Sequence, residues 1–169
     1  MPGKVIGNSL PIGFAGNPSR MSDCVIAPYM YAATNSGNIQ FGEPVAFDSV
    51  NGGVRKIASG DTADAIIGIA VRRMGQPKSD DANGWYYQPG EEVDVLIRGS
   101  IVVPVLNATS IAARGGVYVC KGTGDNRPAG SIVCASGDDT ITMSNAKFST
   151  GKIDAGDMVA EITLTERVI

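Results

Sequence analysis

The sequence contains no histidine among its 169 residues. Catalytic triads, histidine general bases and most mononuclear zinc sites need that side chain, so these chemistries are excluded. Residues 61–63, Asp-Thr-Ala, match a tripeptide of aspartic proteases, but the polar residues 58–60 precede them. An aspartic-protease dyad needs its aspartate buried at the end of an apolar strand. We therefore expect a turn at Asp61 and no enzymatic activity.

Aromatic residues make up only 6% of the chain, and the three cysteines form no C-x-x-C pair. An aromatic-lined cleft of the kind that glycosidases use is therefore not expected. Cys120 and Cys134 stand in apolar stretches, which predicts buried free thiols in a reducing compartment, with a disulfide between them as the alternative. The acidic pairs at residues 80–81 and 91–92 lack EF-hand spacing. We expect no catalytic, cofactor or metal site.

Positive charge is neither abundant nor clustered. The formal net charge is −3, from 14 basic and 17 acidic residues, and the densest basic spot is the pair Arg72 and Arg73. A surface that follows a phosphate backbone needs more cations than that, so direct nucleic-acid binding is not expected. No apolar run approaches the roughly 20 residues of a membrane-spanning helix, so a membrane is not an expected partner either.

Glycine is abundant, and it recurs in one pattern. Four times a glycine, followed by one or two acidic or small residues, leads to a valine that opens an alternating run, at residues 42–45, 90–93, 115–117 and 156–159. Glycine accepts the positive φ of tight turns, and alternation with period two is typical of a strand with one buried face. The sequence therefore predicts an all-β fold, a small barrel or sandwich of short strands with little helix.

The expected strands follow from these alternating and apolar runs. Pro28 indicates an edge or a bulge within the first strand. The runs on either side of Gly99 are expected to form a hairpin that turns there. The strands are predicted at residues 24–31, 43–47, 53–57, 65–71, 91–98, 100–105, 117–121, 131–135 and 158–165. We expect a β-barrel domain over residues 24–169, with a variable loop region near residues 122–150 in which Ile141 and Phe148 are apolar anchors.

Residues 1–23 differ from the rest and are predicted to form an extended N-terminal arm. Prolines and glycines interrupt regular structure there, yet residues 10–16 are distinctly apolar. A solvated linker would be polar, so these side chains must be buried against something. Two interpretations are open: the arm folds over its own barrel, or it lies on a neighbouring subunit. In the second case Leu10, Pro11, Ile12 and Phe14 are interface residues.

Three adjacent aromatic residues, Trp85, Tyr86 and Tyr87, stand at a junction between a loop and a strand. Adjacent strand residues point to opposite faces, so the three cannot all enter one core. One interpretation is a core residue with an exposed neighbour. The other is an interface anchor, because tryptophan and tyrosine are enriched at protein interfaces.

These segments, taken in order, resemble the capsid cement, or head decoration, proteins of tailed phages. The resemblance begins with residues 8–16, Asn-Ser-Leu-Pro-Ile-Gly-Phe-Ala-Gly. It continues through residues 42–45, 67–71, 90–93, 99–103 and 115–119 to the C-terminal strand, and it covers most of the chain. Residues 122–150 fit the pattern least well.

The resemblance implies a structural virion protein and a virion location. Members of that family are similar small β-barrels that sit as trimers on the outside of an icosahedral head. By this resemblance the chain is made in the host cytoplasm, forms a homotrimer, binds the major capsid protein and cements neighbouring capsid subunits against internal DNA pressure. The alternative is a carbohydrate- or receptor-binding β-module, in which residues 85–87 would form a sugar platform.

Overall fold

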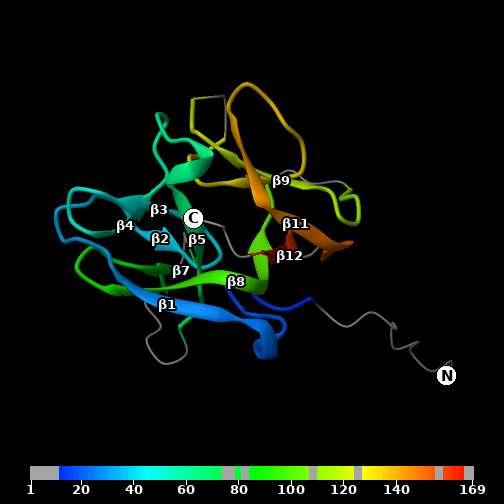
Figure 1. The fold of residues 1–169 in the computed structure, drawn as a ribbon, viewed down its shortest axis with the longest axis horizontal. Helices are drawn as coiled ribbons and strands as arrows, with labels where there is room; N and C mark the ends of the chain where they lie inside the picture. Colours follow the sequence, from blue (N-terminus) through cyan, green and yellow to red (C-terminus); the bar gives the residue numbers. More distant parts are fainter. Residues whose placement is uncertain are drawn as a thin grey trace, which may run out of the picture.

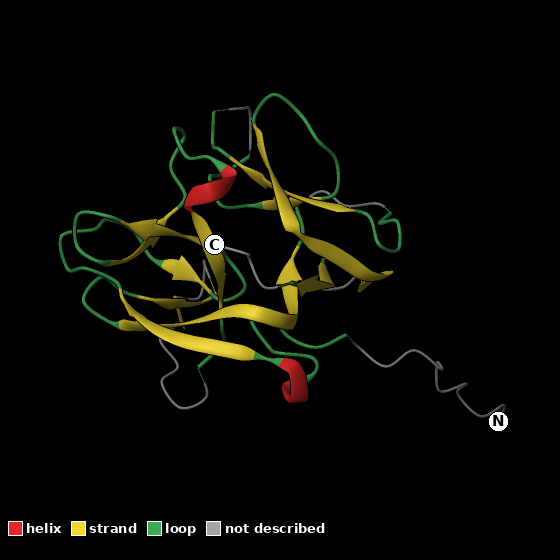
Figure 2. Cartoon of the chain, in the orientation of Figure 1, coloured by secondary structure: helices red, strands yellow, loops and turns green. Residues whose placement is uncertain are grey.

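The computed structural model of the chain describes residues 12–73, 79–80, 84–106, 110–123, 127–154 and 158–165. Strands dominate this part of the chain. Helix is confined there to two short 3-10 turns, η1 (Met21–Asp23) and η2 (Ala63–Ala65), drawn red in Figure 2. The prediction of an all-β fold with little helix is confirmed.

One antiparallel sheet forms most of the molecule, and it curls into a half-barrel (Figure 1). β1 (Val25–Met30) pairs with β8 beside the main path of this sheet. A smaller sheet contains β2 (Ile39–Gln40), β7 (Gly84–Tyr87) and β6 (Ser79–Asp80). The main path runs in the order β10 (Ile132–Val133), β9 (Gly116–Cys120), β11 (Thr140–Asp154), β12 (Val159–Leu164), β8 (Glu92–Pro104), β5 (Ile66–Ala70), β3 (Pro44–Asp48) and β4 (Gly53–Lys56).

The predicted hairpin at Gly99 was wrong, because β8 is one continuous strand. Its first half pairs with β1 and β5, and its second half, from Gly99 on, pairs with β12. Gly99 has φ 122°, and a Cβ built there would lie 2.8 Å from the Sγ atom of Cys24. Only glycine combines that backbone conformation with so close an approach. The residue therefore marks the point where the strand changes partners, not a turn.

The region expected to be a variable loop, near residues 122–150, contains the beginning and much of the strand β11. This strand pairs with β9 from residue 140 to 143, and this pairing shifts register before residue 147. It pairs with β12 from residue 146 to 148, and this pairing shifts register before residue 153. Ile141 and Phe148 are buried, as expected of anchors. Shifted register interrupts the simple period of two, so the sequence pattern of this strand is weak.

Two apolar clusters lie on opposite faces of the sheet formed by β3, β5 and β8. Ile69 and Leu96 belong to the larger cluster, which fills the half-barrel. Ala70 and Val95, their neighbours in sequence, belong to the smaller cluster with Tyr31 and Phe41. Because both faces are covered, these strands are continuous apolar runs. The cysteines at 24, 120 and 134 are all free thiols, so the disulfide alternative is wrong.

Two of the four glycine patterns form the same turn. At residues 40–43 the Glu43 backbone N–H donates to the Gln40 carbonyl (3.1 Å), and the Gln40 N–H donates to the Glu43 carboxylate (2.8 Å). Residues 88–91 repeat both bonds at the same distances. Gly42 (φ 82°) and Gly90 (φ 90°) supply the positive φ that the third turn position needs. The glutamate thus closes each turn just before β3 or β8 begins.

Candidate interaction surface

β1 is an edge strand that exposes apolar side chains. Its strand partner is β8, and just beyond its C-terminal end Tyr31 forms an isolated parallel bridge with Val54 of β4. Figure 1 shows β1 along the outside of the molecule. Val25 is 44% exposed, Ile26 37% and Met30 55%, and Met21 in the preceding η1 is 70% exposed. We call Met21, Val25, Ile26 and Met30 the β1 face. The edge that Pro28 indicated is confirmed.

The backbone of β1 leaves pairing groups on its outer edge. Tyr31 donates its N–H to the Glu91 carbonyl (2.9 Å) and accepts the Gly90 N–H (2.7 Å), so it faces β8. Alternate residues of a strand direct their N–H and C=O groups to the same edge. Because Tyr31 faces β8, the backbone groups of Ile26 and Pro28 point to the opposite, outer edge. Proline has no N–H to donate, so a partner strand would find the N–H of Ile26 and the two carbonyls.

Acidic side chains border the β1 face. Met30 pairs in register with Glu92, and Pro28 pairs with Asp94. Asp23 accepts a hydrogen bond of 2.6 Å from Arg98, and both side chains of this ion pair remain largely exposed. Charged residues beside an exposed edge discourage unspecific pairing with other sheets. The β1 face is therefore an exposed apolar strip with a charged border.

The described part of the arm docks on its own barrel. Gly16 donates its N–H to the Val102 carbonyl and accepts the Arg72 N–H, each at 2.8 Å. Asn17 accepts from Val102 (3.0 Å), and Ser19 donates to Ser100 (2.9 Å). These bonds attach the arm to the second half of β8 and to the segment that follows β5. For residues 16–19, the interpretation of an arm folded over its own barrel is therefore correct.

The apolar arm residues are placed differently from one another. Leu10 and Pro11 lie outside the described residues, and Ile12 is partly buried. Phe14 is 63% exposed, with the Arg72 guanidinium carbon 5.0 Å from its ring centroid in a cation–π contact. The backbone of the arm is thus fixed a few residues away, while the ring of Phe14 remains available to a partner.

The aromatic trio divides between core and surface. Tyr87 is buried in the smaller cluster, packs edge-on against Phe41 and donates its hydroxyl to the Val71 carbonyl (2.6 Å). Burial is the main reason that the pKa of Tyr87 is raised to about 12. Tyr86 is partly exposed, and the side chain of Trp85 lies outside the described residues. Tyr87 therefore serves the fold, which leaves Tyr86 as the described member of the trio that a partner could contact.

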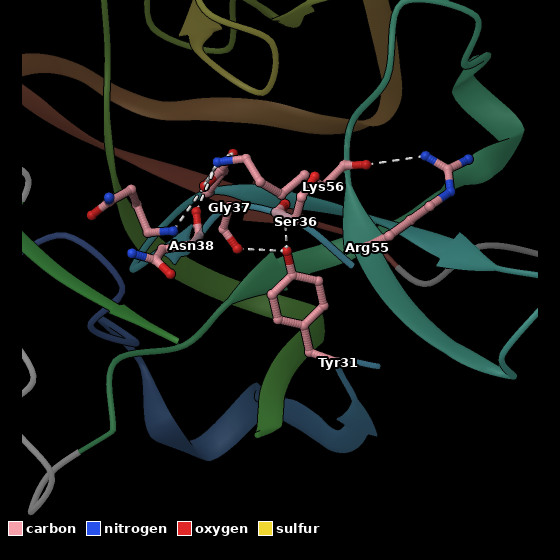
Figure 3. Close-up of polar contacts among 8 residues, drawn as sticks. Tyr31, Ser36, Gly37, Asn38, Arg55 and Lys56 are labelled. Carbon is pink, nitrogen blue, oxygen red and sulfur yellow. Dashed lines mark hydrogen bonds and ion pairs between the residues drawn. The ribbon is translucent and has the colours of Figure 1, made fainter. Parts of the chain in front are cut away.

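The buried polar groups near β2 and β4 hold loops in place. Figure 3 shows the Tyr31 hydroxyl donating to the carbonyls of Ser36 (3.0 Å) and Gly37 (2.8 Å). The Lys56 ammonium donates to the Asn38 carbonyl (2.8 Å) and pairs with the Glu43 carboxylate at 3.1 Å. Burial raises the pKa of Glu43, and the nearby Lys56 opposes that shift. Each group has a structural partner, so the network fixes the loop and offers no reactive centre.

Asp61 also has a structural role. Its carboxylate takes two hydrogen bonds from the Arg55 guanidinium, at 2.6 and 2.7 Å, and one from the Ala58 N–H at 2.7 Å. The Arg55 hydrogen bonds are the main cause that lowers the pKa of Asp61 below its ordinary value. The predicted turn is confirmed, and the carboxylate is ionised and paired, unlike one member of a protease dyad.

Comparison with known proteins agrees with this arrangement. Residues 3–164 match the family model of the XM1 gp53 minor capsid protein. The chain belongs to this family. A chain in a solved structure described as the capsid of Myoviridae phage XM1 has the same fold, with a TM-score of 0.73, 18% sequence identity and full coverage of both chains. No curated protein matches the sequence.

Membership of a minor capsid protein family gives the chain a structural role in the virion of a tailed phage and a place among capsid components. The resemblance to tailed-phage capsid-associated proteins is thereby confirmed. Among the described residues, no helix is long and apolar enough to span a membrane. Sequence reasoning named the arm and the aromatic trio as interface candidates and did not single out the exposed side chains of the β1 face. The available signal was Pro28 inside an apolar run.

Proposed function

We propose that this protein binds the outer face of a phage head as a homotrimer and cements neighbouring major capsid proteins against internal DNA pressure. The observation that carries the proposal is the β1 face, an apolar strip beside an unpaired strand edge in a member of a capsid family. Exposed apolar strips on soluble domains mark interaction sites. A strand edge also adds main-chain hydrogen bonds to an incoming extended segment.

Trimerisation gives a cement protein its holding strength. Three linked attachment surfaces convert a weak contact into tight binding, since the second and third contacts form at high effective concentration. In this proposal the β1 face contacts a capsid subunit. Leu10, Pro11, Ile12 and Phe14 of the arm, with Tyr86 and Trp85, contact either the shell or a neighbouring copy.

The test is rebinding of the purified protein to phage particles that lack it. The variant Ile26→Lys/Met30→Lys places charges on the β1 face, and lysine on an edge strand is well tolerated by the fold. The matched control is Phe47→Lys/Val50→Lys, which changes two exposed apolar residues at the β3–β4 hairpin, 44% and 88% exposed. We expect the β1 variant to lose occupancy at least about tenfold, the effect of 1.4 kcal/mol per attachment.

Equal occupancy of the wild type and the β1 variant would refute the β1 face as the attachment surface. Light scattering of the wild type tests the oligomer separately, with an expected mass of three times 17.5 kDa. A monomer both in solution and on the particle, the latter seen by imaging, would refute the homotrimer.

A further inference from the structure

A hollow of about 480 Å³ lies beside β11 and β12. Arg20 at the end of the arm, Arg114 in the turn before β9, and Lys147 on β11 all line it. The volume falls within the range of small-ligand sites, enough for a few side chains of a partner. Three cations thus converge on one depression of a chain whose formal net charge is −3.

The hydroxyl-bearing residues Ser149 and Thr163 also line this hollow. The Thr163 hydroxyl lies 2.8 Å from that of Ser149, and it lies 2.9 Å from that of the buried Ser100 on β8, which is not part of the lining. Lys147 lies directly opposite Thr163 in the register of β11 and β12. Hydroxyl donors beside cations are the groups that bind carboxylate and phosphate oxygens in proteins.

Two of the cations have no structural partner. Within the described part of the chain, the guanidinium of Arg114 and the ammonium of Lys147 form no ion pair and no hydrogen bond. Arg20 lies 3.7 Å from Glu161, which also accepts a hydrogen bond from Ser19. Arg114 and Lys147 are therefore the two charges in this hollow that remain for an anionic ligand.

The backbone at Arg114 is strained. Its φ is 62°, a left-handed conformation that residues with a Cβ rarely adopt. Its N–H donates to the Phe148 carbonyl at 2.8 Å, which holds the turn against β11. Glycine or asparagine would fit this position with less strain. Residues with strained backbone are concentrated at binding sites.

We propose that the hollow lined by Arg20, Arg114 and Lys147 binds an acidic peptide segment of a partner protein through its carboxylates. A nucleic acid is the less suitable ligand, because three cations beside Glu161 do not form a track for a phosphate backbone. The carboxylates of a peptide can bind Arg114 and Lys147 singly, with the hydroxyls of Ser149 and Thr163 beside them. This inference does not depend on cementing, since binding is measured on the purified protein.

The test is fluorescence anisotropy with a labelled short polyglutamate peptide at low ionic strength. The variant Arg114→Asn/Lys147→Gln removes both unpaired charges, and asparagine suits the left-handed backbone, so the fold is expected to remain intact. The dissociation constant should rise about tenfold or more, as expected for the loss of charge-assisted hydrogen bonds. The matched control Arg73→Gln/Arg127→Gln removes two exposed charges that do not line the hollow. It should change the dissociation constant less than threefold.

Three outcomes would overturn the proposal. The first is no binding of polyglutamate by the wild type. The second is an equal loss in the control variant, which would indicate unspecific attraction to net charge. The third is tighter binding of a single-stranded oligothymidine of equal charge, which would assign the hollow to nucleic acid. Equal melting temperatures of wild type and both variants would show that the loss of binding does not come from unfolding.

Discussion

β1 and β5 are two short apolar strands that pair with the same residue of β8, yet they are buried to very different extents. Leu96 lies opposite Ile26 on β1 and opposite Ile69 on β5. Ile69 is fully buried, whereas Ile26 is 37% exposed. β5 is covered on both faces by the two apolar clusters, and it has β8 on one side and β3 on the other. β1 lies at the outer edge of the sheet.

The difference teaches that an apolar strand can serve two purposes. In β5 the side chains stabilise the chain itself, because their burial removes apolar area from water. In β1 the same kind of side chain contributes little to the isolated fold and is a liability for aggregation, unless a partner covers it. Pro28 and the acidic border limit that liability, so the exposed strip is compatible with a soluble subunit before assembly.

The comparison of the two strands predicts a large difference in stability between matched alanine substitutions. Ile69→Ala should lower the free energy of unfolding by about 2–5 kcal/mol, because it leaves a cavity between packed strands. Ile26→Ala should lower it by less than about 1 kcal/mol, as for other surface changes. Chemical denaturation of the isolated protein measures both values. Equal losses would contradict the distinction between a structural strand and an interaction strand.

A second comparison concerns the ion pairs near the two regions. In one pair, Arg55 of β4 binds Asp61 in the loop that follows, and the carboxylate side chain is only 8% exposed. In the other pair, Arg98–Asp23 beside β1, both side chains are exposed. Asp61→Asn should cost about 1–3 kcal/mol, because it breaks a charge-assisted pair. Asp23→Asn should cost less than about 1 kcal/mol. Thermal melts at pH 7 and moderate salt would show the two shifts, and a larger loss for Asp23→Asn would contradict this assignment.

Aspartates with a lowered pKa make the free energy of unfolding depend on pH in the acid range. The folded pKa of Asp61 lies below its ordinary value of 3.8, and that of Asp48 is lowered to about 2, mainly by a hydrogen bond from the Asn51 side chain. Such groups stabilise the fold above the ordinary pKa and lose that contribution as the pH falls through the folded value. We expect the unfolding free energy to fall below about pH 4, less steeply in Asp61→Asn. Glu43, with its raised pKa, acts in the opposite direction.

Much of the fold could be predicted from sequence because its signals are local. Alternation identified most strands, and Pro28 marked the edge. Gly99 was misjudged because glycine permits both a turn and a bend, and only the contact with Cys24 distinguishes them. β11 was missed because its register shifts interrupt the alternation.

The surface was harder to predict than the fold, for a physical reason. Ile26 and Ile69 occur in equally apolar runs, and their exposure depends on which strands lie beside them in the curled sheet. Arg114 and Lys147 are far apart in the sequence and meet only where β11 packs beside the turn before β9. Sequence reasoning could name Phe14 and Tyr86 as candidates but could not locate either surface.

The smallest expected effect on stability is at Phe14, and its value lies in the contrast with Phe148. Phe14→Ala removes a ring that is 63% exposed and one cation–π contact with Arg72. The free energy of unfolding should therefore fall by no more than about 1 kcal/mol. Phe148→Ala empties a site that is only 1% exposed and should cost about 3–5 kcal/mol. Both are measured by denaturation, with occupancy on phage particles as the second readout for Phe14→Ala. Reduced occupancy at unchanged stability would place Phe14 in an interface. A loss of stability comparable to that of Phe148→Ala would instead make its ring part of the barrel core, and attachment would then depend on the β1 face.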